Sequence, residues 1–252
     1  MKRLVGLAAA AFILALWHWM AFGDGWLRTV AARSGPGEDD DMHEQRAAMV
    51  QTLRAYGIRD ERILTTMGRV RRHRFIPEAY RWASDPYGDH PCPIGHQQTI
   101  SQPYIVAYMT ERIAPQPGEK ILEIGTGSGY QAAILADLGA DVYSIEIIPE
   151  LADHARQVLA SEGFAVKVLT GDGYKGWPEH APFDAVIVTC APEQLPQALV
   201  DQLKDGGRMI LPLGERFAQR LVILRKEAGQ VRTEEDLPVR FVPMVPGKPD
   251  SP

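Results

Sequence analysis

Short apolar segments alternate with helical patterns through the middle of this chain, and this alternation constrains the fold more than any other feature. An apolar run of about four to eight residues between turn residues predicts a buried strand, because it is too short for a core helix. Strands separated by helices lie parallel in one sheet with helices on both faces. We therefore expect an α/β fold with a doubly wound, mostly parallel sheet, with strands at 120–124, 142–146, 166–170, 185–189 and 209–211 and helices at 130–138, 149–161 and 194–203.

Further elements flank this central region on both sides. Met49, Leu53 and Tyr56 recur at helical spacing, and a second helix is expected after Asp60, whose side chain suits an N-cap. A third helix is expected over residues 103–113. The fold class is therefore an α/β sheet with added N-terminal helices and C-terminal strands, the latter at 221–224 and 239–242, one of them antiparallel at an edge.

The first residues form a segment of a different kind. Lys2 and Arg3 precede an apolar run of 19 residues at 4–22, which is the order of charged and apolar regions in a signal peptide. The small residues ahead of Asp24 suit cleavage there. An uncleaved membrane anchor fits as well, since a helix rises about 1.5 Å per residue and this run would cross a thin hydrocarbon core. Residues 1–23 are thus expected to be a signal peptide or a membrane anchor.

An acidic linker and one larger domain follow this segment. Glycine, proline and consecutive acids in SGPGEDDD cannot pack into a core, so residues 24–41 are expected to be a linker. Residues 42–252 suffice for one domain. The chain has 27 basic and 32 acidic residues, a formal charge of −5, which gives it no global attraction to nucleic acid. Its two cysteines, Cys92 and Cys190, are too few for a disulfide framework.

A glycine-rich turn follows the first central strand. Gly125, Gly127 and Gly129 stand between that strand and a helix, where glycine allows close approach of the backbone to a ligand. A dinucleotide-binding turn would need a glycine at the position of Tyr130, so the spacing argues against one. Glu123, inside the strand, would repel a phosphate but would suit a cationic or amino-bearing ligand.

Two further acids follow the next two strands. Glu146 ends the second strand, where a carboxylate can accept hydrogen bonds from ribose hydroxyls. Asp172 follows the third strand and could accept from an adenine amino group, although a turn or cap role is the alternative for either acid. The carboxyl ends of parallel strands share one edge of the sheet, so these acids should line one crevice with the glycines. A ligand with adenine, ribose and a charged amino-acid end but no phosphate is S-adenosylmethionine.

Four segments carry the most specific patterns of the chain, and TISQP and RFVP are the most distinctive parts of them. With these segments the chain resembles the protein-L-isoaspartate O-methyltransferases, which methylate isoaspartyl residues in damaged proteins. The similarity covers most of residues 58–245. The segments are PIGHQQTISQPYIVAYMTE at 93–111, LEIGTGSGYQAAILA at 122–136, GDGYKGWPEHAPFDAVIVTCAP at 171–192 and VRFVPMV at 239–245.

The resemblance assigns roles residue by residue. Ser101 matches the active-site serine of the family, and residues 239–245 match a segment that shapes the substrate cleft. The family usually has Gly-Gln-Gly-Gln at 95–98, where this chain has His96 and Gln97, and this departure leaves the fine substrate preference open. The residues expected to bind the cofactor are Thr99, Ile100, Gln102, Glu123, Gly125, Gly127, Gly129, Glu146, Asp172 and Gly173.

The resemblance also implies the activity and its setting. We expect an S-adenosylmethionine-dependent protein carboxyl methyltransferase that is a monomer, acts on isoaspartyl proteins and peptides, and binds no nucleic acid. The alternative is an adaptor that binds the cofactor and recognises damaged or partner proteins without turnover. The family is usually cytoplasmic, whereas residues 4–22 would instead give an inner-membrane-anchored or exported protein.

The expected reaction needs few catalytic groups. A substrate carboxylate has an ordinary pKa of about 3.9, so at neutral pH it is already an anionic nucleophile and needs no general base. Ser101 would orient this carboxylate, while its alternative role is the N-cap of the helix that begins at Pro103. His90, Cys92 and His96 lie close in sequence without the spacing of a zinc site, so no metal is expected.

Overall fold

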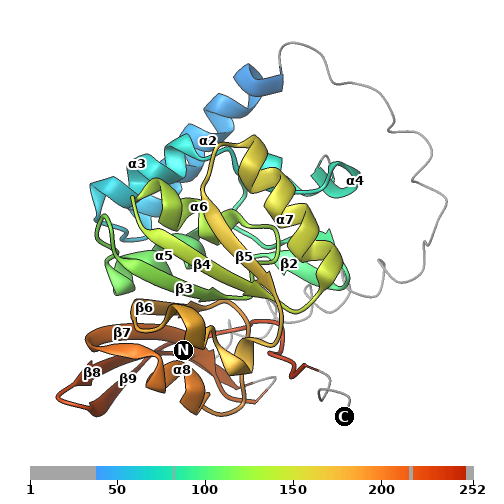
Figure 1. The fold of residues 1–252 in the computed structure, drawn as a ribbon. Coiled ribbons are helices and arrows are strands. Elements are labelled where there is room, and N and C mark those ends of the chain that lie inside the picture. Colours follow the sequence, from blue (N-terminus) through green and yellow to red (C-terminus); the bar gives the residue numbers. More distant parts are fainter. Residues whose placement is uncertain (1–37, 82, 216–217, 248–252) are drawn as a thin grey trace, which may run out of the picture. The chain divides into compact units, whose positions relative to one another are not determined.

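A seven-stranded sheet organises the domain in the computed structural model, which describes residues 38–81, 83–215 and 218–247. The strand order is β5-β4-β3-β6-β7-β8-β9 (Figure 1). The first five strands in this order are mutually parallel, and the last two pair antiparallel. The strands are β3 (Lys120–Ile124), β4 (Asp141–Glu146), β5 (Val166–Thr170), β6 (Phe183–Val188), β7 (Leu203–Leu213), β8 (Gln219–Glu227) and β9 (Gln230–Val239).

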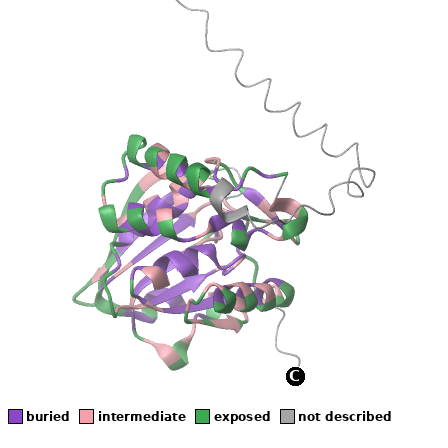
Figure 2. Cartoon of the chain, turned by 90° about the horizontal axis from the view of Figure 1, so that it is seen from above, coloured by how far each residue is buried: buried purple, intermediate pink, exposed green. Residues whose placement is uncertain are grey.

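Helices cover both faces of this sheet, as a doubly wound fold requires. One face packs against α5 (Pro103–Ile113), α6 (Tyr130–Asp137) and α7 (Pro149–Ser161). The opposite face buries Leu122, Ile124 and their neighbours against α8 (Gln197–Asp201). In Figure 2 the buried residues follow the strands through the centre of the domain. The predicted fold class is confirmed.

Helices and a small hairpin precede the sheet. They are α2 (Glu38–Ala55), α3 (Glu61–Arg69), the 3-10 turn η1 (Arg72–Phe75), α4 (Glu78–Arg81), and the antiparallel strands β1 (Cys92–Gly95) and β2 (Gln98–Ile100). Asp60 is the N-cap of α3, as predicted, and accepts from the backbone N–H of Arg62 at 2.9 Å. Two further 3-10 turns, η2 (Gly173–Lys175) and η3 (Pro178–His180), lie between β5 and β6.

Two predicted C-terminal elements differ from the structure. The helix predicted at 194–203 is only the five-residue α8. The strand predicted at 239–242 is absent, because β9 already ends at Val239. The backbone of Val242 and Met244 is instead hydrogen-bonded to Ala191 in the loop after β6, at 2.8 Å each. The chain after β9 therefore leaves the sheet edge and crosses to the carboxyl ends of the parallel strands.

The predicted signal peptide or anchor at 1–23 lies outside the described residues, as does most of the predicted linker at 24–41. Helix α2 begins at Glu38, four residues before the expected start of the domain. Among the helices that the structure describes, none has the length and hydropathy needed to cross a membrane.

Candidate active site

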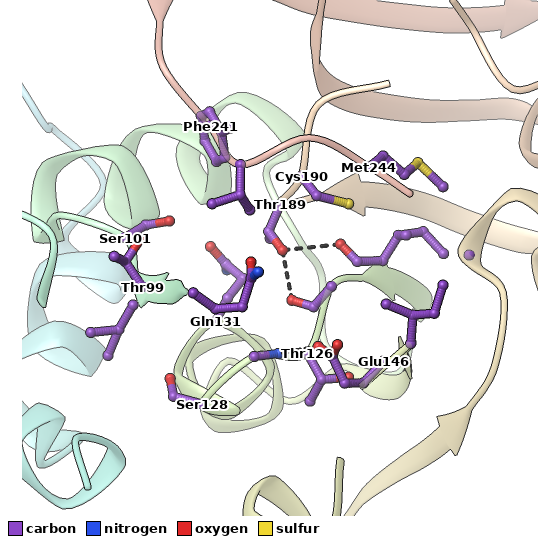
Figure 3. A pocket seen from close by; sticks show the side chains of 18 of the residues that line it. Thr99, Ser101, Thr126, Ser128, Gln131, Glu146, Thr189, Cys190, Phe241 and Met244 are labelled. Atoms are coloured by element: carbon purple, nitrogen blue, oxygen red, sulfur yellow. Dashed lines mark hydrogen bonds between the residues drawn. The ribbon is translucent and has the colours of Figure 1, made fainter. Parts of the chain in front are cut away.

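A cavity of about 200 Å³ opens at the carboxyl ends of the parallel strands. Its walls come from the turn after β3, the end of β4, the loop after β6 and the segment after β9. Figure 3 shows Ser101 and Thr99 on one side of this cavity and Glu146 on the other. The lining residues are Gln98, Thr99, Ile100, Ser101, Ile105, Val106, Met109, Ile124, Gly125, Thr126, Gly127, Ser128, Tyr130, Gln131, Ile145, Glu146, Ile147, Ile148, Gly173, Thr189, Cys190, Phe241, Val242, Pro243, Met244 and Val245.

The glycine turn brings backbone to the cavity. Gly125 has a φ of +93°, which L side chains rarely adopt, and a Cβ there would lie 2.5 Å from Thr189 Oγ1. The Thr189 hydroxyl lies 2.6 Å from the carbonyl oxygen of Gly125 and 3.0 Å from that of Ile124, and it ties the two loops together. Gly125 and Gly127 line the cavity as predicted, whereas Gly129 lies outside it as the N-cap of α6.

Glu146 lies in the cavity wall, where the sequence placed it. Its side chain is 5% exposed. Oε2 accepts from the N–H of Gly127 at 2.7 Å, and Oε1 accepts from the N–H of Ile148 at 3.0 Å. Each carboxylate oxygen has two lone pairs, so both oxygens can still accept from a ligand hydroxyl. The arrangement suits a pair of ribose hydroxyls.

Glu123 does not line the cavity, contrary to the prediction. It is fully buried, Oε2 accepts from the Ser144 hydroxyl, and Oε1 has no partner among the described residues. Burial raises the pKa of Glu123 to about 8; the Ser144 hydrogen bond opposes this rise and the charge of Glu146 adds to it. Glu123 is therefore mostly neutral at pH 7 and offers little charge to attract a cationic ligand, while its contact with the cofactor stays a prediction. Ser144 in turn hydrogen-bonds Thr126, 2.6 Å away in the cavity wall.

Asp172 also lies outside the cavity, and its neighbour Gly173 lines it. The Asp172 carboxylate caps η2 by accepting from the N–H of Tyr174 at 2.9 Å. This is the cap role that the sequence left open as the alternative to adenine recognition. A carboxylate that caps its own turn is held close to the backbone, which explains why the side chain does not reach the cavity.

The TISQP segment connects β2 to α5. Thr99, Ile100 and Ser101 line the cavity, and Gln102 occupies the N-cap position of α5 without a side-chain cap bond. Ser101 is therefore not the cap that the sequence offered as its alternative role. Within the described residues the Ser101 hydroxyl has no hydrogen-bond partner, so it is available to a ligand. Ser101 thus lies in the cavity wall, and its catalytic role stays a prediction.

A second cavity, of about 780 Å³, adjoins the first. Ser101, Thr99, Ile105, Thr189 and residues 241–243 stand in the walls of both. The second cavity is large enough for several peptide residues, and its walls include Gln102, Tyr104 and residues 237–240. The two cavities therefore share a part of their walls that includes Ser101.

The comparisons with known proteins identify the family. The sequence profile described as protein-L-isoaspartate(D-aspartate) O-methyltransferase matches residues 44–248. The chain belongs to this family. The protein-L-isoaspartate O-methyltransferase of Gloeobacter violaceus is 52% identical over 201 residues, which cover 79% of this chain and 97% of that relative. The enzyme of that name from Synechococcus is 50% identical over 219 residues, 83% of this chain and 89% of the relative.

Solved structures agree with this result. A protein-L-isoaspartate O-methyltransferase superposes with a TM-score of 0.72 at 28% identity, covering 79% of this chain and 65% of that one. A putative member from Plasmodium falciparum, solved in complex with S-adenosyl-L-homocysteine, superposes with a TM-score of 0.71 at 26% identity over 79% of this chain and 98% of that one. The sheet and its helices are thus those of an S-adenosylmethionine-dependent methyltransferase.

The first cavity fits S-adenosylmethionine as the cofactor of this family. Backbone approaches the cavity at Gly125 and Gly127, and Glu146 has free lone pairs for ribose. No lysine or arginine lines this cavity in the part of the chain that the structure describes, which suits a ligand without phosphate. Both cysteines are free, and burial raises the pKa of the Cys190 thiol in the wall, so it stays protonated.

The C-terminal strap, residues 241–245, forms one wall of the cavity, at the segment that the resemblance assigns to the substrate cleft. Two hydrogen bonds between Gln219 and Phe241 hold this strap. Gln219 Nε2 donates to the carbonyl of Phe241 at 3.2 Å, and the backbone N–H of Phe241 donates to Gln219 Oε1 at 2.6 Å. Tyr174 donates to the carbonyl of Met244 at 3.3 Å. The sequence reasoning missed Thr126, Ser128, Gln131, Thr189 and Cys190; of these, Thr189 could have been found from its place at the carboxyl end of the fourth parallel strand.

Proposed function

We propose that this chain transfers the methyl group of S-adenosylmethionine to the α-carboxylate of L-isoaspartyl residues at the junction of the two cavities. Family membership supports the activity. The observation that carries the placement is that Ser101 lines both cavities and that its hydroxyl has no hydrogen-bond partner among the described residues. The first cavity would hold the cofactor, and the second would hold the isoaspartyl residue with its flanking peptide.

In this reaction the residues of the chain bind the cofactor and orient the substrate carboxylate, and they transfer no proton. Bound S-adenosylmethionine supplies a methyl group on a sulfonium centre. The substrate carboxylate is anionic at neutral pH, so the O–CH₃ bond forms as the S–CH₃ bond breaks, and no proton is released. Ser101 donates a hydrogen bond that aims the carboxylate, and the strap at 241–245 helps to exclude water. Orientation is then the main contribution of the protein.

The product explains the repair. A methyl ester is a better leaving group than a carboxylate, so the neighbouring backbone amide nitrogen displaces methanol and closes a succinimide. Hydrolysis of the succinimide yields some normal aspartyl peptide. The chain needs no further catalytic group for these steps, because both proceed in solution after the ester is released.

The proposed activity also indicates the partners and the compartment of the protein. We infer that isoaspartyl proteins and peptides are the partners, that the protein is a monomer, and that it binds no nucleic acid. S-adenosylmethionine is made in the cytoplasm, which supports a catalytic domain on that side. Residues 4–22 are apolar enough to attach the chain to the inner membrane or direct its export, and fractionation with protease accessibility distinguishes these arrangements.

The activity is tested with a pair of peptides that differ only in the linkage of one aspartyl residue. Methyl transfer should go to the isoaspartyl peptide and hardly at all to its aspartyl twin. Ser101→Ala should lower kcat/KM about 10- to 100-fold, the effect of losing a hydrogen bond to a charged group, and should leave cofactor affinity intact. Equal rates on both peptides would refute the proposal, and binding without transfer would favour the adaptor.

A further inference from the structure

The position of Ser101 is set by its backbone. Its hydroxyl has no partner among the described residues, and Ser101 lies between the last residue of β2, Ile100, and the N-cap of α5, Gln102. Aligning the substrate by one hydrogen bond requires that the donor be held in place, because a displacement of about 1 Å can cost about 100-fold in rate. Whatever fixes the start of α5 therefore fixes the catalytic hydroxyl.

The start of α5 is held by a residue from another loop. Gln102 makes no side-chain cap bond, and Pro103 has no N–H to donate. Instead Asp89 Oδ1 accepts from the N–H of Tyr104 at 2.8 Å, and Asp89 Oδ2 accepts from Gln102 Nε2 at 3.3 Å. One carboxylate thus binds the residues one and three positions after Ser101. Its negative charge also suits the N-terminus of α5.

The loop that carries Asp89 is held in place by a buried arginine. Arg72 is fully buried, and its Nε donates to the carbonyl of Pro86 at 2.8 Å while Nη2 lies 3.5 Å from the carbonyl of His90. These two carbonyls flank Asp89 in sequence. The guanidinium also stacks on Tyr130, with its carbon 5.1 Å from the ring centroid, and Tyr130 lines the first cavity. The loop is therefore fixed to the wall of the cofactor cavity.

We propose that Asp89 is a positioning residue for methyl transfer: it caps α5 from outside the helix and thereby holds Ser101 against the substrate carboxylate. Asp89 lines neither cavity, so it acts through Ser101 and touches no substrate. The inference rests on the proposed function for the role of Ser101. The hydrogen bonds that carry it are independent of that function.

Turnover provides the first test. Asp89→Ala should lower kcat on the isoaspartyl peptide about 10- to 100-fold with an unchanged dissociation constant for S-adenosylmethionine. Asp89→Asn keeps an acceptor for the Tyr104 N–H and should recover most of the rate. In a Ser101→Ala background, Asp89→Ala should cost less than about twofold more, because residues that act through one another are not additive. Full multiplicative loss in the double variant would overturn the proposal.

Asp60→Ala is the matched control, since Asp60 also caps a helix by accepting a backbone N–H, and that helix is α3. It should leave kcat within about twofold of the parent. Hydrogen exchange gives a readout without activity: the Tyr104 amide should exchange about tenfold faster in Asp89→Ala than in Asp60→Ala. Unchanged exchange at Tyr104 would overturn the capping role, whereas faster exchange with an unchanged kcat would overturn the link to Ser101. A parent protein that exchanges as expected but transfers no methyl would instead contradict the proposed function.

Discussion

The N–H of Gly127 donates to Glu146 Oε2 across 2.7 Å, so the acid at the end of β4 holds the glycine turn after β3. The other oxygen of the same carboxylate accepts from Ile148 at 3.0 Å. Glu146 thus ties together two parts of the cavity wall, the turn at Gly127 and the backbone at Ile148. Each of its oxygens keeps a lone pair, so the same side chain could also accept a hydrogen bond from a ligand in the cavity that it lines.

Replacement of Glu146 should therefore weaken cofactor binding. Glu146→Ala removes two hydrogen bonds to the loops and those to the ribose, and we expect S-adenosylmethionine affinity to fall by about 1–3 kcal/mol. Calorimetric titration measures this directly. Glu150→Ala, an exposed carboxylate in the first turn of α7, is the control and should change nothing. An unchanged dissociation constant for Glu146→Ala would show that the ribose binds elsewhere.

The buried Glu123 predicts a pH dependence of stability. Its pKa is about 8 in the folded protein against 4.5 in the unfolded chain, mainly because burial disfavours the charged form. Between these pH values the folded state binds more protons than the unfolded state, so the contribution of Glu123 to the free energy of unfolding is full below pH 4.5 and is lost as the pH rises through about 8.

Glu123→Gln removes this titration while keeping the shape of the side chain. The unfolding free energy of the variant, measured by urea denaturation from pH 5 to pH 8, should gain on that of the parent as the pH rises. Two curves that stay parallel across this range would show that Glu123 is ionised in the folded protein.

The sequence predicted best those strands that are continuous apolar runs and those helices whose first or last residues are typical of helix ends. The predicted bounds of β3 and α5 match the structure, because a buried apolar run and a proline at the first helical turn are signals within a few residues. The hairpin of β1 and β2 was missed, since its short strands alternate poorly and its turn contains no Asn-Gly or Asp-Gly pair.

The errors at the site have tertiary causes. The sequence shows that Glu123 is an acid beside the glycine turn, but its burial and neutrality depend on how β3 packs in the sheet. The segment after Val239 has strand-forming residues, yet the Gln219 side chain takes the hydrogen bonds of Phe241 that a sheet partner would need. A side chain that substitutes for backbone pairing leaves no periodic trace in the sequence.

Replacing Gln97 with glycine should stabilise the turn between β1 and β2. Gln97 has a φ of +58°, in the left-handed region, where a residue with a Cβ is disfavoured by about 1–2 kcal/mol. Glycine relieves this cost but adds about 0.5–1 kcal/mol of unfolded-state entropy, so Gln97→Gly should raise the free energy of unfolding by about 0.5–1 kcal/mol. Gln98→Gly, one residue later in β2, should lower it. Urea denaturation measures the free energy of unfolding of both variants. A loss of stability in Gln97→Gly would show that the backbone of Gln97 is not strained.

A chain that begins at Glu38 should retain the fold and the activity. Helix α2 begins there and buries Met49 and Leu53, while Arg46 donates from its Nε to the carbonyl of Gly68 at 2.8 Å, so α2 belongs to the domain. Residues 4–22 would expose a long apolar surface on a soluble domain, and we expect them to serve targeting alone. The shortened chain should be soluble, bind S-adenosylmethionine and methylate isoaspartyl peptides as well as the full chain in detergent.

A second truncation that begins at Ile58 provides the contrast. It removes α2 with its buried residues and should lose the cooperative thermal transition, because Met49 and Leu53 are only 3% and 0% exposed. Thermal unfolding and the peptide assay, run on both shortened chains, separate the roles of the two segments. If the chain from Glu38 unfolds or loses activity while the full chain keeps both, residues before Glu38 are part of the fold and their assignment to targeting is wrong.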